Sequence, residues 1–552
     1  MSEILKAPEW SLNRALLKSM GNTDEDIDQP IIGIANSWNE LVPGHYPLRE
    51  IADRVKKGIV SAGGTPLEFG TIAVCDGIAQ GHEGMRYVLP TREIIAASVE
   101  VMYRAHKLDG LVLLASCDKA VPGMLMAAAR LNAPSILVNA GPMLSGHFEK
   151  CNPYGGSLVD SSAVEEGYGS FLEGKLTAEE YRELEDRACP SCGSCAMLGT
   201  ANTMSFSSEA MGMSLPGSST IPPTDAERYR ASEASGRALM DLVKKGIRAR
   251  DIINRKSIEN ATRAVLSIGG STNFVLHILA IAKEAKVDFS LDDIEKLSDT
   301  TPTIASIMPS SPFGCAEFHY AGGMRAVMNE IKSLLHLDAM CANGKTLGEN
   351  ITNAGVKDMR IIRTLNEPFH KTGGLAVLRG NIAPRGAIAK PSAVPKDLFF
   401  FKGTAKVFDG ENEAIKAITQ DRIEDGDVVV IRYEGPKASG MPEMFKPMKL
   451  MRGKGIKAAL ITDGRFSGSN NGLFVGHISP EALEGGAISL IEDGDTIKID
   501  LEKRRIDALV SEEVFEERRK RAGKHEPKVK EGLLAVYSKL ASSADRGAVI
   551  EW

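Results

Sequence analysis

The sequence predicts an α/β protein with a second domain that is a β-barrel. Between residues 30 and 140, short apolar runs alternate with segments of helical periodicity, the pattern of a parallel sheet built with right-handed crossovers. After about residue 362, short β-rich segments and turn residues replace the long helices. A chain of 552 residues is also too long for one core. We therefore expect an N-terminal parallel-sheet α/β domain over residues 1–365 and a C-terminal β-barrel domain over residues 366–552.

The first domain is expected to contain four strands, each a short apolar run without helical period. These runs are Ile31–Ala35, Ile72–Val74, Leu111–Ala115 and Ile136–Val138. Apolar residues at helical spacing predict the intervening helices, at residues 48–59, 93–106 and 124–131.

Residues 160–360 are expected to be mostly helical, with a charged surface helix at Ala178–Arg187 and a buried one at Thr203–Met213. The turn Gly269–Asn273 precedes a predicted helix, Phe274–Lys283. Such a turn can bind an anion through free backbone N–H groups, but a plain N-cap by Ser271 or Thr272 is an equal alternative.

Six short strands are expected in the second domain, separated by turns such as Asp409-Gly410 and Asp493-Gly494. They are Gly374–Leu378, Gly403–Phe408, Asp427–Arg432, Ala458–Thr462, Asp495–Asp500 and Arg505–Val510.

Composition excludes several classes of partner. The chain is 43% hydrophobic and 25% charged, with a net charge of −6 and no block of Lys or Arg, which argues against nucleic acid or an anionic membrane. No apolar run approaches the length of a membrane span. Residues 1–10 have no apolar signal-peptide core, so we expect a cytoplasmic protein. Its eight cysteines are then expected to be free thiols or metal ligands rather than disulfides.

Two of the predicted strands run into the dipeptide Cys-Asp. The first leads to Cys75-Asp76 and the second to Cys117-Asp118-Lys119. Open α/β sheets hold ligands at the carboxyl ends of their strands, so neighbouring strand ends of this kind predict one site. The plain alternative is strands that merely end in polar residues.

The remaining cysteines add a second indication. Cys192 and Cys195 lie in the loop Cys-Pro-Ser-Cys-Gly-Ser-Cys, which has neither the second close pair of a structural zinc site nor the helix start of a redox motif. Scattered thiolates instead suit an iron–sulfur cluster, and three protein ligands would leave one iron open as a Lewis acid.

The carboxylates point to a hard cation. Asp76 and Asp118 suit Mg²⁺, which keeps open positions for water or substrate. Lys119 is an odd neighbour for a cation unless carbamylation turns it into an anionic ligand; otherwise it is an ion-pair partner of Asp118. In the second domain, loops containing Glu443 and Ser467 follow predicted strands. Ser467 can act as a base only if a metal or cation stabilises its alkoxide.

Together these motifs resemble the family of dihydroxy-acid, 6-phosphogluconate and sugar-acid dehydratases. The matching stretches span roughly residues 30–545 and are specific in their order and joint presence. They are Cys75–Ala79 with Gly81–Met85, Cys117–Lys119 with Pro122-Gly123, Gly193–Cys195 with Thr200–Met204, Gly269–Asn273, Arg432–Lys437 and Thr462–Gly468.

The resemblance implies a fold, a set of cofactors and a role for each site residue. Cys117 and Cys195 would bind the iron–sulfur cluster, and Ser467 would be the proton acceptor. Mg²⁺ would be held by four residues: Asp76, Asp118, carbamylated Lys119 and Glu443. The implied fold joins an α/β domain to a β-barrel with the site between them, and the implied assembly is a homodimer or a dimer of dimers.

One position departs from the family pattern. Members with a [2Fe–2S] cluster carry a cysteine in the stretch that matches Val42–His45, where this chain has Gly44. We expect the third thiolate to be Cys75, which adjoins Asp76, with Cys192 as the alternative. We favour a [4Fe–4S] cluster with one open iron over a [2Fe–2S] cluster.

The implied reaction is dehydration of a 2,3-dihydroxy carboxylate to a 2-keto acid. For the route to valine, isoleucine and leucine, the substrates would be 2,3-dihydroxy-isovalerate and 2,3-dihydroxy-3-methylvalerate. Two alternatives remain at this point. One is a sugar-acid (aldonate) dehydratase with the same chemistry, and the other is a non-catalytic iron–sulfur sensor, which would not need Ser467 or Glu443.

Overall fold

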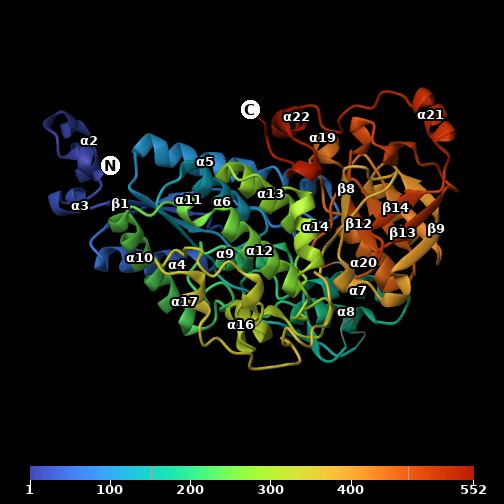
Figure 1. Ribbon diagram of the computed structural model, residues 1–552, viewed down its shortest axis with the longest axis horizontal. Helices are drawn as coiled ribbons and strands as arrows, with labels where there is room; N and C mark the ends of the chain where they lie inside the picture. Colours follow the sequence, from blue (N-terminus) through green and yellow to red (C-terminus); the bar gives the residue numbers. More distant parts are fainter. Residues whose placement is uncertain (151, 153–154, 470, 552) are drawn as a thin grey trace.

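The computed structural model describes residues 1–150, 152, 155–469 and 471–551. Its two main sheets lie in different parts of the chain, and Figure 1 shows the blue-to-green α/β part on the left and the orange-to-red sheet on the right. The predicted fold class, a parallel-sheet α/β domain followed by a barrel-like domain, is confirmed.

The first sheet has four parallel strands in the order β2-β1-β3-β4. Three of these strands, β1, β3 and β4, are buried at every position and mainly apolar, as expected for a sheet covered on both faces. The strands are β1 (Ile31–Asn36), β2 (Thr65–Gly70), β3 (Gly110–Leu114) and β4 (Ser135–Val138). Helices α4 (Leu48–Ser61), α5 (Thr91–His106), α6 (Ala120–Leu131) and α10 (Ala226–Lys245) surround it, with α4 packed on α10 and α5 on α6.

The predicted strand Ile72–Val74 is wrong. The strand in this region is β2 instead. It ends five residues before Cys75, and residues 71–75 have no regular structure. β2 is an edge strand and pairs with β1 from Ile31↔Thr65 to Asn36↔Gly70, and one further bond, from Thr71 N–H to the Asn36 carbonyl (3.0 Å), ends the pairing where β1 ends. An edge strand tolerates Pro66 and is only half buried, and so it lacks the apolar run by which buried strands are recognised.

Residues 160–360 are mainly helical, as predicted. The helix predicted at Ala178–Arg187 is α8, with the same bounds, and the buried helix is α9 (Thr200–Ala210), every residue of which is buried. The other longer helices are α7 (Ser161–Leu172), α12 (Arg255–Ile268), α13 (Asn273–Ala285), α14 (Leu291–Asp299) and α16 (Gly323–Glu330). Shorter ones are α11 (Ala249–Ile252), α15 (Cys315–Tyr320) and α17 (Leu347–Ile351), and α1 (Ser2–Leu5), α2 (Ser11–Ser19) and α3 (Asp24–Asp28) begin the chain.

The second sheet has eight strands in the order β14-β13-β9-β10-β11-β12-β8-β7. The central strands β9 to β12 are parallel, and antiparallel pairs extend the sheet on each side. Its two edges nearly meet, because Arg379 N–H donates to the Arg504 carbonyl (2.9 Å) and Ile506 N–H donates to the Arg379 carbonyl (3.0 Å). The sheet is therefore a nearly closed barrel.

The barrel strands are β7 (Ala376–Leu378), β8 (Gly386–Ala389), β9 (Phe400–Phe408), β10 (Asp427–Ile431), β11 (Ala459–Thr462), β12 (Phe474–Ser479), β13 (Thr496–Asp500) and β14 (Arg505–Ala508). Strands β8 and β12 were not predicted. The helices of this part are α18 (Glu411–Thr419), α19 (Pro436–Ser439), α20 (Phe445–Lys454), α21 (Glu512–Arg521) and α22 (Gly532–Leu540). A small separate sheet pairs β5 (Gly146–His147) with β6 (Leu158–Val159).

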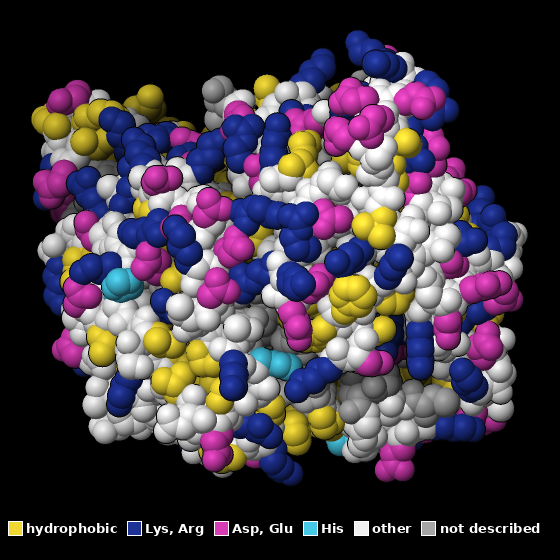
Figure 2. Space-filling model, turned by 45° about the vertical axis from the view of Figure 1, so that its right-hand side comes forward, with side chains coloured by type: hydrophobic (Ala, Val, Ile, Leu, Met, Phe, Trp, Pro, Cys, Tyr) yellow, Lys and Arg dark blue, Asp and Glu magenta, His cyan; other side chains and the backbone are white. Residues whose placement is uncertain are grey.

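The surface mixes charges of both signs: on the face in Figure 2, Lys and Arg side chains are interspersed with Asp and Glu. Among the described residues, no helix is both long and apolar enough to cross a membrane. The seven cysteines in the described part of the chain are free thiols, and Cys151 lies outside it.

Candidate active site

The carboxyl ends of three neighbouring strands in the first sheet carry the candidate residues of the N-terminal half. The segment after β1 contains Gly44 and His45, the segment after β2 leads to Cys75-Asp76, and Cys117-Asp118-Lys119 follows β3. Parallel strands end at the same sheet edge, so these segments converge.

The barrel contributes two loops from the carboxyl ends of its neighbouring parallel strands β10 and β11. One loop carries Glu443 and the other carries Arg465 and Ser467. A β-bridge joins Glu443 to Arg465, and Met444 N–H donates to the Arg465 carbonyl (2.9 Å). The two barrel loops are thus held side by side against the sheet ends of the first half.

Three carboxylates from these segments form one cluster, in which Asp76 and Glu443 are buried and Asp118 is partly exposed. One oxygen each of Asp76, Asp118 and Glu443 lie within 4.8 Å of one another. Arg465 reaches the cluster from the barrel: both of its terminal nitrogens lie 3.3 Å from Asp76 Oδ2, and it also pairs with Glu443. The Arg465 side chain is fully buried, and its Nε donates to the Met441 carbonyl (2.8 Å).

Burial and mutual repulsion shape the protonation of this cluster. Burial, and then the neighbouring Asp76 carboxylate, raises the pKa of Asp118 to about 7. Burial also raises the pKa of Glu443, against the attraction of Arg465. For Asp76, burial favours a higher pKa, but the charges of Lys119 and Arg465 outweigh it and lower the pKa. Such opposed shifts within one cluster are typical of functional sites.

The donor set fits a divalent cation. Asp76 Oδ1 is buried and has no hydrogen-bond partner among the described residues, although Oδ2 of the same carboxylate is bound by Lys119 and Arg465. An unsatisfied buried carboxylate oxygen is costly, and a cation among three carboxylates would remove that cost.

Lys119 is present as an unmodified side chain and is buried. Its Nζ lies 2.8 Å from Asp76 Oδ2 and 3.7 Å from Asp118 Oδ2. In this form Lys119 is the ion-pair partner that the sequence left open as the alternative, although the closer partner is Asp76 rather than Asp118. Lys119 lies at the edge of the carboxylate cluster. A carbamate on its Nζ would therefore add a further oxygen ligand for a cation bound there.

Three thiols lie together beside the cluster. Charges on Cys75 and Cys195 each contribute to the raised pKa of Cys117, after the larger effect of burial, and Cys75 contributes likewise to that of Cys195. Cys192 is exposed and is not among the main influences on either thiol, whereas Cys189 has a smaller effect than Cys75 on Cys195. A set of three soft donors fits an iron–sulfur cluster.

Gly44 borders the same thiols. A Cβ at position 44 would lie 2.3 Å from Cys117 Sγ and 3.3 Å from the Ser194 backbone, so the position at which the family resemblance implies a cysteine in [2Fe–2S] members lies against Cys117. The adjacent His45 is fully buried: Nδ1 bonds to the Ser37 carbonyl (2.8 Å) and Nε2 accepts from Cys117 N–H (2.9 Å). Burial lowers the pKa of His45 to about 4, so the neutral ring fixes the Cys117 backbone.

Ser467 is buried next to the carboxylates. Its Oγ lies 2.6 Å from Ser469 Oγ. The Ser467 hydroxyl also interacts with Glu443 and lowers its pKa, against the larger effect of burial. The intervening Gly468 lies against the segment that follows Cys195, because a Cβ at Gly468 would be 2.1 Å from the Leu198 carbonyl oxygen. Ser467 therefore lies between the carboxylate cluster and the thiol-bearing loop.

The turn Gly269–Asn273 has a role that the sequence did not indicate. Thr272 Oγ1 donates to the Phe466 carbonyl (2.8 Å), beside Ser467. Asn273, in the amide orientation that satisfies both of its ends, accepts from Arg465 (3.0 Å) and donates to Phe466 (3.1 Å). The turn at the N-terminus of α13 is thus bound to the barrel loop that carries Ser467. Sequence reasoning assigned no role to Arg465, Asn273 or His45, although each lies within or beside a motif.

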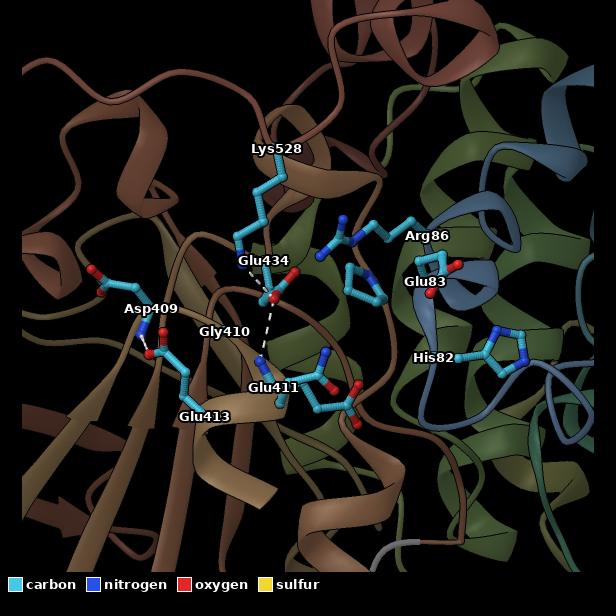
Figure 3. A pocket seen from close by; sticks show the side chains of 11 residues that line it. His82, Glu83, Arg86, Asp409, Gly410, Glu411, Glu413, Glu434 and Lys528 are labelled. Carbon is cyan, nitrogen blue, oxygen red and sulfur yellow. Dashed lines mark hydrogen bonds and ion pairs between the residues drawn. The ribbon is translucent and has the colours of Figure 1, made fainter. Parts of the chain in front are cut away.

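A cavity of about 250 Å³ opens next to the site. Figure 3 shows it between His82–Arg86 on the side of the first half and residues 409–413, Glu434 and Lys528 on the barrel side. Pro442 lines it and precedes Glu443, and Met85, next to Arg86, receives a contact from Arg465 (3.5 Å). The cavity thus adjoins the carboxylate cluster without containing it.

A buried hydroxyl, a carboxylate cluster and grouped thiols, all at the junction of the sheet and the barrel, define an enzyme active site. Comparison with known proteins gives the family. The N-terminal model of the dihydroxy-acid/6-phosphogluconate dehydratases matches residues 29–350, and their C-terminal model matches residues 360–548. The chain belongs to this family of dehydratases, and the resemblance inferred from its motifs is confirmed.

Full-length relatives carry the name dihydroxy-acid dehydratase. The protein of that name from Pyrococcus furiosus is 50% identical over 554 residues, covering 99% of both chains. Those from Caldanaerobacter subterraneus and Ignicoccus hospitalis are each 48% identical, over 99% and 100% of this chain and 98% and 100% of their own.

Proposed function

We propose that this protein is a dihydroxy-acid dehydratase that converts 2,3-dihydroxy-isovalerate and 2,3-dihydroxy-3-methylvalerate to 2-keto acids in branched-chain amino acid biosynthesis. The observation that carries the proposal is the meeting of Ser467, the carboxylate cluster and the thiols at one junction. The full-length similarity to relatives of that name supports the choice of substrate.

Four residues would hold Mg²⁺ and three thiolates would hold the cluster. The magnesium ligands are Asp76, Asp118, Glu443 and Lys119 as a carbamate, and the cluster ligands are Cys117, Cys195 and Cys75. When bound, the cation would stabilise negative charge that develops on the substrate carboxylate, and the open iron would assist departure of the 3-hydroxyl. We retain [4Fe–4S] as the favoured form, with [2Fe–2S] as the alternative.

The protein's own groups carry the proton. As an alkoxide, which the bound cation would stabilise, Ser467 takes the proton from C2 onto Oγ and becomes a neutral hydroxyl, within reach of Ser469 Oγ at 2.6 Å. Arg465 keeps Glu443 and Asp76 in place through its ion pairs. The enol that forms tautomerises to the keto acid.

We propose a homodimer or dimer of dimers on the strength of the family resemblance, and we propose that it acts in the cytoplasm. The substrate is a small anion, and the proposal includes neither nucleic acid nor a membrane as a partner.

Replacing Ser467 tests the catalytic assignment. We expect Ser467→Ala to lower kcat for 2,3-dihydroxy-isovalerate by a factor of 10² to 10⁴, roughly the contribution of one general base. Iron content, magnesium content and the melting temperature should match those of the wild type, because the side chain is small and its main partner is Ser469. Ser489→Ala, at another barrel serine bound only to a backbone carbonyl, is the matched control and should keep full turnover.

Unchanged turnover in Ser467→Ala would reject Ser467 as the base. A second assay, with gluconate, arabinonate and xylonate beside 2,3-dihydroxy-isovalerate, tests the substrate. Turnover of sugar acids alone would establish the aldonate dehydratase instead, and no turnover of any acid by cluster-loaded protein would favour an iron–sulfur sensor.

A further inference from the structure

Two buried lysines donate hydrogen bonds to the turn that carries Ser467. Lys390 directly follows β8, and its Nζ donates to the Gly468 carbonyl (2.8 Å). Lys449, on α20, donates to the Ser469 carbonyl (2.8 Å). Both side chains are almost completely buried, so the two ammonium groups hold consecutive carbonyls of one short turn.

The two lysines differ in how their charges are balanced. Lys449 forms an ion pair with Glu166 (2.8 Å), and Asn471 lies near both groups. Lys390 has no carboxylate partner among the described residues, and its hydrogen bond goes to Gly468 alone. The titratable groups that act on it are the Lys449 ammonium and the Cys315 thiol. Lys390 is therefore a buried amine without a counter-ion.

A buried charge without a partner is costly, so a buried amine loses its proton more readily than an exposed one unless a negative charge forms beside it. Here the natural counter-charge is transient. If Ser467 acts as a base, its oxygen bears negative charge before it takes the C2 proton, one residue from the carbonyl that Lys390 holds. A protonated amine held at that point stabilises this negative charge without reorganisation of solvent.

We propose that Lys390 is a positioning residue for the dehydration, which fixes the Ser467–Ser469 turn through Gly468 and supplies the positive charge that balances the deprotonated serine. This proposal rests on Ser467 being the base. Lys449 has a different task, because Glu166 already neutralises it: it anchors the turn to α7 and α20.

The ionisation of Lys390 agrees with this role. Burial, and then the charge of Lys449, lowers the pKa of Lys390 to about 7. The amine is thus able to gain charge when a negative group forms nearby, and in either form it has N–H groups to donate to Gly468.

The test uses the holoenzyme, purified without oxygen and loaded with iron and magnesium. Lys390→Met keeps the length of the side chain and removes its nitrogen. We expect kcat to fall by a factor of about 10², with KM within about twofold of the wild type and with unchanged iron content. With substrate deuterated at C2, the isotope effect on kcat should be at least as large as in the wild type, because proton removal is the step that is slowed.

The matched control is the double variant Lys449→Met/Glu166→Gln, which removes a buried lysine from the same turn together with its counter-ion. We expect a lower melting temperature for this variant. Its kcat should fall much less than that of Lys390→Met. A purely structural role for Lys390 predicts the same pattern in both variants.

Three outcomes would overturn the inference. They are a kcat for Lys390→Met within twofold of the wild type, a loss of kcat that equals the loss of folded or cluster-loaded protein, and a C2 isotope effect that falls below the wild-type value. Ser467→Ala separates this failure from failure of the proposed function. If that variant is inactive while Lys390→Met is fully active, only the role of Lys390 is wrong.

Discussion

At the scale of single residues, the types of side chain at the site were readable from the sequence, but their partners were not. Cys75, Asp76 and Lys119 were recognised as donors because thiol, carboxylate and amine groups follow one another at expected strand ends. The structure adds that Asp76 is held by Arg465 from the barrel, 389 residues away along the chain. No local pattern records a contact over that separation.

Cys75 and Cys192 give a prediction at this scale. We expect Cys75→Ser to lose most of the iron bound after anaerobic reconstitution, because Cys75 lies close enough to Cys117 and Cys195 to affect the pKa of both. Cys192→Ser should keep the wild-type amount, because Cys192 is exposed. Iron and sulfide per chain, with the visible spectrum, measure the difference. Equal and full iron in both variants would show that neither is a ligand.

At the scale of elements, helix periodicity predicted most helices of the first half because their buried faces are apolar at regular spacing. The bounds of α8 agree with the prediction, and α4 differs only at its end. The edge strand β2 and the short barrel strands β8 and β12 were not predicted. Each of them is stabilised by pairing with a partner strand, and its own residues do not form a recognisable apolar pattern.

The packing of α4 on α10 gives the prediction at this scale. The helices approach closely through two glycines: a Cβ at Gly58 would lie 2.0 Å from the Glu233 carbonyl oxygen, and one at Gly236 would lie 2.4 Å from that of Val55. We expect Gly58→Ala to cost about 1–3 kcal/mol of stability through this clash, despite the higher helix propensity of alanine.

Thermal unfolding measures this cost, and Gly70→Ala is the control, since a Cβ there meets no atom within 4 Å. The melting temperature should fall for Gly58→Ala and stay close to wild type for Gly70→Ala. A melting temperature for Gly58→Ala equal to that of the control would mean that the helices can separate without cost.

At the scale of the whole molecule, the end of the chain lies against the first half. Arg92 of α5 is fully buried and donates to the carbonyls of Gly547 (2.9 Å) and Ala548 (3.0 Å), while it pairs with Glu93. Tyr537 of α22 also donates to the Ala548 carbonyl (2.6 Å). These bonds tie the last described residues to the α/β part, so the two halves are linked both at the site and at the C-terminal segment.

Arg92→Lys should weaken this link, because a single ammonium cannot reproduce the several directed bonds of the guanidinium. We expect about 1–3 kcal/mol of destabilisation and faster release of the C-terminal segment by limited proteolysis. Arg104→Lys is the control, since Arg104 is exposed and, among the described residues, forms its ion pair with Glu100 on the same helix. Equal rates of cleavage in both variants would contradict the proposed link.

The sequence by itself determined the class of fold and the family, because burial leaves a periodic apolar pattern and chemistry leaves donor residues after predicted strands. The kinds of ligand at the site remain a prediction from those donors. Only the tertiary structure decided where β2 ends, how the barrel closes between Arg379 and Arg505, and that Arg465, Asn273 and Lys390 bind in and around the loop that carries Ser467. The physical reason is that these features depend on contacts between segments far apart in the chain, whose free energy no single segment contains.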